Sequence, residues 1–152
     1  MRMSNSYFLT LKEDVKGEES TSANLLVRTG MIKKVGSGIY TFLPMGLRVL
    51  RKIENIVREE MNRIDSQELL MPSLIPSEYY EKCGRVSSFG PDMFNLEDRY
   101  GKKHSLGPTH EELFAIAASM KMKSYKDLPF TTYQQADKFR DEMRPRLGLV
   151  RV

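Results

Sequence analysis

Apolar residues recur at intervals of three and four between positions 46 and 64, which is the strongest helical pattern in the chain. Such spacing gives an α-helix one apolar face. Pro44 precedes the pattern, where a proline is tolerated in a helix. Residues 68–72 then have the composition of a strand, which must end at its proline because proline cannot donate a further ladder hydrogen bond. The apolar stripe consists of Leu47, Leu50, Ile53, Val57, Met61 and Ile64.

Two shorter elements are predicted before this helix. Residues 20–28 have a helical pattern, with a serine or threonine available as its cap, and Gly30 can close it in the left-handed conformation. The glycines of residues 36–38 indicate a tight turn, and residues 39–42 then alternate like a strand. A Gly-Ser-Gly run can also cradle a phosphate, but this run lacks the preceding strand and the following lysine of a P-loop, so the turn is favoured.

Short elements follow the strand that ends at Pro72. Residues 77–82 indicate a helix capped by the serine at its start, and residues 87–91 are expected to be a loop. Residues 93–97 and 103–106 read as two strands joined by a tight turn.

A helix running to about Met122 is predicted to begin around the sequence Thr109-His110-Glu111-Glu112. Thr109 and Glu112 have the spacing of a capping box, which accounts for both residue types. Glu111 then lies in the first turn, where a carboxylate can face a cleft, and His110 is predicted to point away. From the residues alone, capping is favoured over ligand binding.

The stretch Phe-Arg-Asp-Glu-Met-Arg-Pro-Arg at 139–146 carries the most concentrated candidate chemistry. Residues 130–138 alternate like a strand, so Arg140 and Glu142 are predicted to share one face at its end. A guanidinium group suits a phosphate, and a carboxylate can accept hydrogen bonds from an amine. The spacing alone favours a solvent-exposed salt bridge, since most charged pairs on strands do no more.

Composition indicates a globular domain, or part of one, without a membrane segment. The 152 residues are 29% charged and 40% hydrophobic, and no apolar run approaches the roughly 20 residues that span a bilayer. The one cysteine, Cys83, allows no intrachain disulfide, so a reducing cytoplasm is expected. The net charge of +4 is spread along the chain and is weak evidence for an anionic partner.

Three segments together resemble one enzyme family. The sequences Phe-Arg-Asp-Glu and Arg-Pro-Arg, followed by a loop ending in Arg151, resemble motif 2 of the class II aminoacyl-tRNA synthetases. The resemblance is closest to the bacterial type of prolyl-tRNA synthetase. Residues 46–72 resemble motif 1, which forms much of the dimer interface in that family. Residues 107–112 resemble the Thr-X-Glu loop that holds the amine of the bound amino acid.

The resemblance implies an α/β fold of the α+β type, a class II synthetase-like antiparallel sheet flanked by helices and truncated within motif 2. Residues 1–152 would be the N-terminal portion of the catalytic domain, with motif 1 at about 46–72 and an incomplete motif 2 from about residue 130. Motif 3, the editing domain and the anticodon-binding domain would be absent. The fragment alone is therefore expected to be inactive.

The implied activity is the ATP-dependent ligation of proline to its tRNA through prolyl-adenylate. ATP is a substrate, and Mg²⁺ would bridge its phosphates although no ligand for it can be identified in the sequence. A homodimer through motif 1 is also implied. Two alternatives stay open: a non-catalytic synthetase-like module that binds nucleic acid or protein, and a class II synthetase for another amino acid. The implied site residues are Arg140 for catalysis and ATP, Glu142 and Arg151 for ATP, Thr109 and Glu111 for proline, and Arg144 and Arg146 for the tRNA acceptor end.

Overall fold

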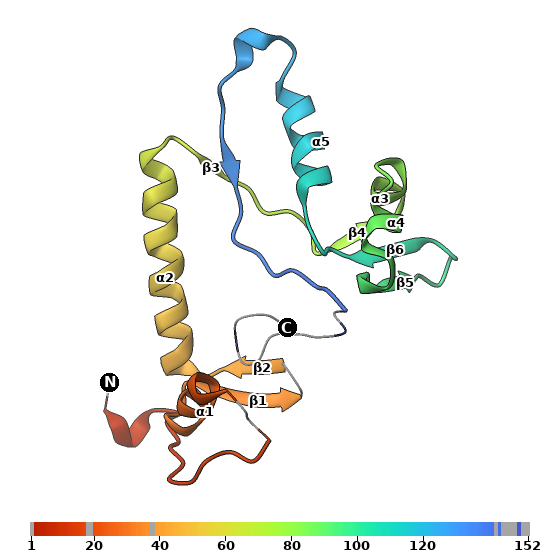
Figure 1. Cartoon of the computed structure of the whole chain (residues 1–152). Helices are drawn as coiled ribbons and strands as arrows, with labels where there is room; N and C mark the ends of the chain where they lie inside the picture. Colours follow the sequence, from red (N-terminus) through yellow and green to blue (C-terminus); the bar gives the residue numbers. More distant parts are fainter. Residues whose placement is uncertain (1, 18–19, 37–38, 142, 144–148, 150–152) are drawn as a thin grey trace. The chain divides into compact units, whose positions relative to one another are not determined.

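A computed structural model of the protein describes residues 2–17, 20–36, 39–141, 143 and 149 (Figure 1). The chain divides into two compact units, the first built on Met1–Val57 and the second comprising Arg58–Met143. The long helix α2 (Pro44–Arg63) begins in the first unit and ends in the second.

The first unit places a helix and a β-hairpin before α2. A 3₁₀ turn, η1 (Met3–Asn5), is followed by α1 (Thr21–Arg28), β1 (Ile32–Gly36) and β2 (Ile39–Phe42). Ser20 caps α1 by accepting a hydrogen bond from the backbone of Ala23, and Gly30 follows the helix with a φ of 68°. Both predictions for this helix are confirmed. A side chain at Gly30 would also collide with the carbonyl oxygen of Leu9, so both the positive φ and this close contact require glycine there.

The hairpin β1–β2 was predicted only in part. The strand at 39–42 is confirmed as β2, but its antiparallel partner β1 was not predicted. The two adjacent lysines in β1 interrupt the apolar alternation by which a strand is recognised.

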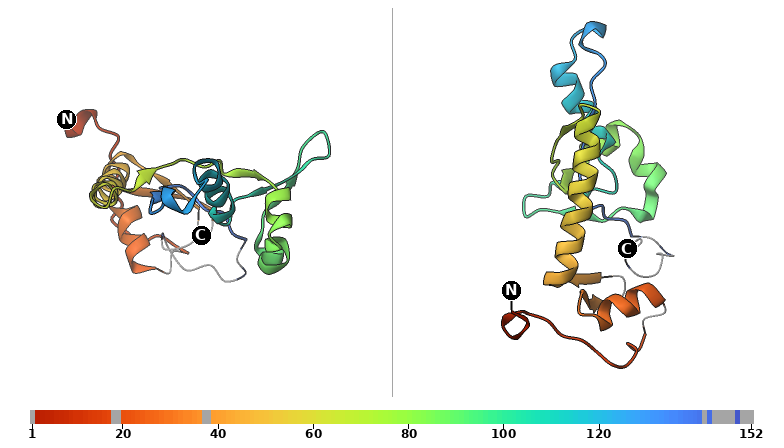
Figure 2. Two further views of the ribbon diagram at one scale, coloured as in Figure 1. Left: turned by 90° about the horizontal axis from the view of Figure 1, so that it is seen from above. Right: turned by 90° about the vertical axis from the view of Figure 1, so that its left-hand side faces the viewer.

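Helix α2 confirms the strongest prediction of the sequence. Figure 2 shows it as one uninterrupted helix. Its predicted apolar stripe is covered only in part. Leu47, Leu50 and Met61 are half-buried, whereas Ile53 and Val57 are exposed.

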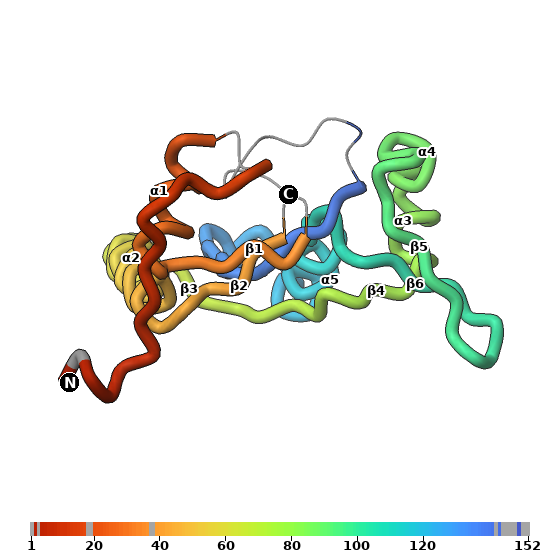
Figure 3. The backbone as a smooth tube through the Cα atoms, turned by 90° about the horizontal axis from the view of Figure 1, so that it is seen from below, coloured from red at the N-terminus to blue at the C-terminus, as the bar shows by residue number. Residues whose placement is uncertain are grey.

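In its described residues, the second unit contains two small sheets and, after α2, three helices of regular α type. Strands β4, β6 and β5 form an antiparallel sheet in that order, and β3 pairs in parallel with β7. Figure 3 follows the backbone through these segments as a tube. The predicted hairpin is thereby confirmed as β5–β6. The elements are β3 (Gln67–Glu68), β4 (Leu74–Pro76), α3 (Glu78–Lys82), α4 (Arg85–Phe89), η2 (Gly90–Asp92), β5 (Asn95–Glu97), β6 (Lys103–Leu106), α5 (Glu111–Lys121), η3 (Tyr125–Asp127) and β7 (Thr132–Tyr133).

A small core holds α3 and α5 against the three-stranded sheet. Ile75, Tyr80 and Met93 are buried at its centre, and Leu113 of α5 packs against them. The hydroxyl of Ser77 is hydrogen-bonded to that of Ser105 at 3.0 Å within this core. This packing anchors the start of α5, where the candidate site lies.

Three local predictions for this unit are wrong. Residues 87–91 form parts of α4 and η2 instead of a loop. Ser77 precedes α3 but makes no side-chain capping bond, because its hydroxyl is engaged with Ser105. Of the predicted strand at 68–72, only Glu68 belongs to a described strand, β3, and Leu69 adds one backbone hydrogen bond to Tyr133 of β7.

Candidate functional site

Helix α5 begins at Glu111, one residue later than the predicted capping box requires. Its N-cap residue is His110, which makes no side-chain capping hydrogen bond. Thr109 is therefore displaced from the capping position, and Glu112 is not placed to complete a box. The carboxylate of Glu112 instead pairs with Nε of Arg85 at 3.1 Å. The capping explanation for Thr109 and Glu112 is wrong.

The backbone of Thr109 is held from α3. The hydroxyl of Tyr80 donates a hydrogen bond of 2.9 Å to the Thr109 carbonyl oxygen, and Tyr80 is completely buried. Burial, reinforced by the nearby charges of Glu112 and Glu111, raises the pKa of Tyr80 to about 12. The phenol therefore remains a protonated donor at neutral pH.

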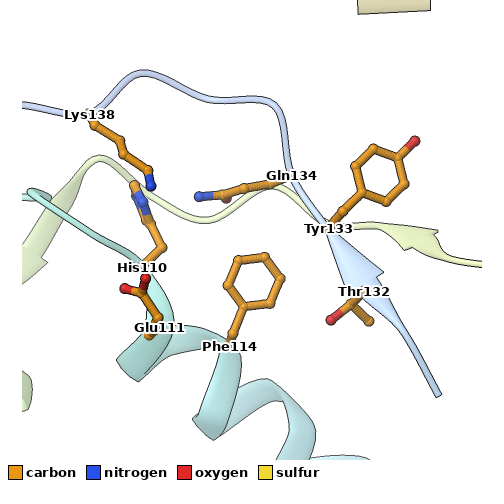
Figure 4. A pocket seen from close by; sticks show the side chains of 7 residues that line it. All are labelled: His110, Glu111, Phe114, Thr132, Tyr133, Gln134 and Lys138. Carbon is orange, nitrogen blue, oxygen red and sulfur yellow. The ribbon is translucent and has the colours of Figure 1, made fainter. Parts of the chain in front are cut away.

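A cleft of about 230 Å³ opens beside the first turn of α5 (Figure 4). One wall comes from the helix and the other from β7 and the residues that follow it. The cleft combines a carboxylate, an amine, an imidazole, an amide and aromatic rings, so it offers both charges and an apolar surface to a small polar ligand. Its lining residues are His110, Glu111, Phe114, Thr132, Tyr133, Gln134 and Lys138.

His110 lines this cleft together with Glu111, so the prediction that it points away is wrong. Figure 4 shows its ring directed toward Lys138. The side chain is only 2% exposed, and neither ring nitrogen has a hydrogen-bond partner of good geometry among the described residues. Burial lowers the pKa of His110, and the charge of Lys138 adds to this, although the Pro72 carbonyl opposes it. The ring is therefore neutral at pH 7.

Arg140 lies beside the loop that leads into α5. Its Nε donates a hydrogen bond of 3.1 Å to the Pro108 carbonyl oxygen. The neighbouring backbone N–H of Phe139 donates to the Gly107 carbonyl at 3.1 Å. The structure thus brings Arg140 next to the Gly107–Glu111 segment, although they are distant in sequence.

The predicted strand leading to Arg140 is not formed as expected. The described strand β7 ends at Tyr133, and residues 134–141 make isolated backbone hydrogen bonds to Gly107 and Asp92 in place of a ladder. A strand-end position for Arg140 is therefore wrong. The other predicted residues of this region, Glu142, Arg144, Arg146 and Arg151, lie outside the described residues.

Several residues of the cleft were not predicted as site residues. Phe114 follows His110 by four positions, so the spacing of a helix face could have indicated that they lie together. Gln134 and Lys138 follow the end of β7 and carry no such periodic signal. Their place in the cleft depends on tertiary packing.

The described part of the chain contains neither a cluster of metal ligands nor a helix that could cross a membrane. No group of three or more His, Cys, Asp or Glu residues in it is arranged to hold a metal ion. Within the same residues, no helix is both long and apolar enough to cross a membrane.

Comparison with known proteins identifies aminoacyl-tRNA synthetases among the relatives of this chain. No protein-family model matches the chain. The curated proline–tRNA ligase of Thermotoga maritima is 54% identical over 152 residues, which are 100% of this chain and 26% of that protein. The chain thus spans about a quarter of the length of the curated relatives it matches.

Solved structures agree on the fold. A Giardia lamblia prolyl-tRNA synthetase in complex with prolyl-adenylate superposes with a TM-score of 0.70 and 26% identity, covering 80% of this chain and 26% of that chain. The RNA binding domain of threonyl-tRNA synthetase from Cryptosporidium parvum Iowa II gives a TM-score of 0.77 at 22% identity, covering 86% and 33% respectively. The resemblance to prolyl-tRNA synthetases and the mixed α/β synthetase fold are confirmed.

Proposed function

We propose that this chain is a segment of a proline–tRNA ligase, which activates proline with ATP and transfers the prolyl group to tRNA. The observation that carries the proposal is the contact of Arg140 with Pro108, which brings the arginine of the motif 2 resemblance next to the Thr109–Glu111 loop. The 54% identity to the Thermotoga maritima enzyme supports the choice of proline.

In this proposal Glu111 binds the ammonium group of proline. Its carboxylate faces a cleft that also contains the ring of Phe114, an apolar surface suited to a pyrrolidine ring. Thr109 is assigned to the same subsite by the resemblance, and Tyr80 holds its backbone two residues before Glu111. An ion pair in a partly enclosed cleft is stronger than one in open water.

Arg140 acts on the phosphate side of the reaction. An oxygen of the proline carboxylate attacks the α-phosphorus of ATP, a new P–O bond forms, and pyrophosphate leaves. Negative charge grows on the phosphate oxygens during this step, and a positioned guanidinium stabilises it. Arg140 takes this role, Glu142 meets the adenine amino group and Arg151 meets the triphosphate.

The proposed enzyme also uses a metal ion, contacts tRNA and forms a dimer. Mg²⁺ accompanies ATP and neutralises its phosphates when bound. Arg144 and Arg146 approach the acceptor end of tRNA. The enzyme works in the cytoplasm as a homodimer joined through residues 46–72.

Two other functions are less well supported: a synthetase for another amino acid and a non-catalytic binding module. A synthetase for another amino acid is disfavoured, because the chain is 54% identical to a proline enzyme and 22% identical to the threonyl-tRNA synthetase structure. A non-catalytic binding module would not need a cation beside the amino-acid loop, yet Arg140 lies there.

Substitution of Glu111→Gln in a full-length protein that contains this segment tests the proposal. Loss of the charged partner should raise the Michaelis constant for proline about 10- to 100-fold, as expected for a hydrogen bond to a charged group. The Michaelis constant for ATP should stay within about twofold. ATP–pyrophosphate exchange at varied proline and ATP measures both constants.

The matched control is Glu97→Gln, an equivalent change of an exposed carboxylate on β5. It should leave both constants unchanged. Equal increases in the two constants for Glu111→Gln would count against the assignment, since a residue that binds the amine contacts only the amino acid.

A further inference from the structure

We propose that α3 and α4 position the amino-acid loop through two tethers, Tyr80 to Thr109 and Arg85 to Glu112. These contacts make Tyr80 and Arg85 positioning residues for proline, although neither lines the cleft. The inference rests on the proposed function and assigns a role to residues that the proline resemblance does not include.

The first tether is a hydrogen bond between two buried groups. The Tyr80 hydroxyl donates to the Thr109 carbonyl at 2.9 Å, and Thr109 is 3% exposed. Tyr80 itself sits in the core with Ile75 and Met93, which leaves its ring little freedom. Removing the hydroxyl would leave a buried carbonyl without its partner, and such a group is costly enough to displace the loop.

The second tether is an ion pair at the first turn of α5. Oε1 of Glu112 lies 3.1 Å from Nε of Arg85, and the Glu112 side chain is 5% exposed. Its other carboxylate oxygen has no hydrogen-bond partner in the described structure. A carboxylate buried in this way depends on its cationic partner, so Arg85 of α4 holds the helix start in place.

The two tethers lie on either side of Glu111, the residue that binds proline in the proposed function. One holds residue 109 and the other holds residue 112, so the backbone of His110 and Glu111 is fixed from both sides. A binding carboxylate must be kept within about 0.5 Å of its productive position by surrounding contacts. An ordinary packing role would affect stability alone, whereas positioning also affects the Michaelis constant for proline.

The first experiment compares Tyr80→Phe with Ser77→Ala in a full-length protein that contains this segment. Both remove one hydroxyl hydrogen bond from the same core, but Ser77 bonds Ser105 and not the loop. Tyr80→Phe should raise the Michaelis constant for proline about tenfold and change that for ATP less than twofold. Ser77→Ala should leave both unchanged. Equal shifts in the two constants, no shift, or the same shift in both variants would overturn the proposal.

Two substitutions of Arg85 test the second tether, one that removes its charge and one that keeps it. Arg85→Ala should raise the Michaelis constant for proline, and Arg85→Lys should restore most of the loss because it retains the charge. If lysine and alanine behave alike, the ion pair has no positioning role.

Hydrogen exchange on the 152-residue chain separates this inference from the proposed function. The N–H of Phe114 bonds the His110 carbonyl at 2.9 Å in the first turn of α5, and that of Met122 bonds Ala118 at the other end. Tyr80→Phe should speed exchange about tenfold at Phe114 and leave Met122 unchanged. If the unsubstituted full-length protein lacks proline-dependent exchange of pyrophosphate, the proposed function fails, and the Phe114 amide alone then decides whether the tether exists. Unchanged exchange at Phe114 would overturn it.

Discussion

At the residue scale, the carboxylate of Glu68 joins α2 to the β3–β7 pair. It accepts hydrogen bonds from Nε and Nη2 of Arg58 at 2.7 and 3.1 Å, and one from the Tyr133 hydroxyl at 3.3 Å. The Arg58 hydrogen bond is the main cause that lowers the pKa of Glu68, against an opposing effect of burial. The charged form is thus favoured in the folded state.

This shift predicts a pH dependence of stability. Because the folded pKa lies below the unfolded value of about 4.3, the stabilisation is present above that value and is lost as the pH falls through the folded pKa. We expect Glu68→Gln to unfold at lower urea concentration than the unsubstituted chain at pH 7. The two unfolding curves should converge as the pH falls below about 4.

A double substitution serves as the control. In an Arg58→Gln background, Glu68→Gln should have a smaller effect at pH 7, because the main hydrogen-bond donor is already gone. A difference in urea midpoint that stays constant between pH 7 and pH 3 would contradict the prediction.

The roles of Glu111 and Arg140 stay predictions that rest on their motifs. The structure does bring the segments of these two residues together, which residue type alone could not show. The capping role of Thr109 was wrong because the start of α5 was set one residue too early. That start is held by Tyr80 and Arg85, which are distant in sequence and give no local signal.

At the element scale, replacing Gly46 in the first turn of α2 should change stability in the direction opposite to that expected from helix propensity. Propensity alone says that Gly→Ala in a helix stabilises by about 1 kcal/mol. In the structure, however, a Cβ at Gly46 would collide with the carbonyl oxygen of Met31. We expect Gly46→Ala to lower the free energy of unfolding by about 1–3 kcal/mol, as overpacking does.

Chemical denaturation of the chain measures this effect. The control is Asn62→Ala, an exposed position in the last turns of the same helix, which should stabilise by about 0.5 kcal/mol through propensity. Stabilisation by both substitutions would show that the contact with Met31 does not constrain α2.

Elements were predictable where their pattern is local. Helix α2 and the β5–β6 hairpin follow from periodicity and turn residues alone. The strand expected at 130–138 reduces to Thr132–Tyr133, because a strand persists only where a neighbouring backbone pairs with it. That neighbour is β3, and neither its position nor its length can be read from residues 130–138.

At the scale of the whole molecule, α2 carries an apolar surface that the described chain leaves exposed. Val49, Ile53 and Ile56 are 45%, 54% and 60% exposed, and their spacing places them on one side of the helix. Contiguous apolar surface of this kind marks an interaction site, and a second copy of the chain would cover it in a two-fold arrangement. This is the basis for proposing a homodimer through residues 46–72.

Light scattering on a full-length protein that contains this segment tests the dimer. Ile53→Glu should reduce the molar mass from that of a dimer to that of a monomer at micromolar concentration, because a charge would be buried without a partner. Arg51→Glu, an exposed change on the opposite side of α2, should leave the dimer intact. A monomer without any substitution would rule out the interface.

The last prediction concerns the 152-residue chain by itself, which should not form prolyl-adenylate at a measurable rate. The chain spans about a quarter of its relatives, whereas stabilising the charge on the α-phosphate requires donors fixed on several sides. In the proposed function Arg140 supplies one such donor, and its Nε donates a hydrogen bond to the Pro108 carbonyl oxygen. A missing donor of this kind typically costs about 100- to 1,000-fold in rate, so a site that lacks even one would turn over at least about 100-fold more slowly.

Pyrophosphate exchange with proline, run in parallel on the chain and on a full-length protein that contains it, measures the difference. We expect exchange by the chain below detection, while the tethered Thr109–Glu111 loop is already in place and gives weak proline binding in a calorimetric titration. Glu111→Gln should abolish that weak binding, which ties it to the cleft. Exchange by the chain within tenfold of the full-length rate would contradict the prediction, and would mean that Arg140 and the residues of the cleft suffice for catalysis.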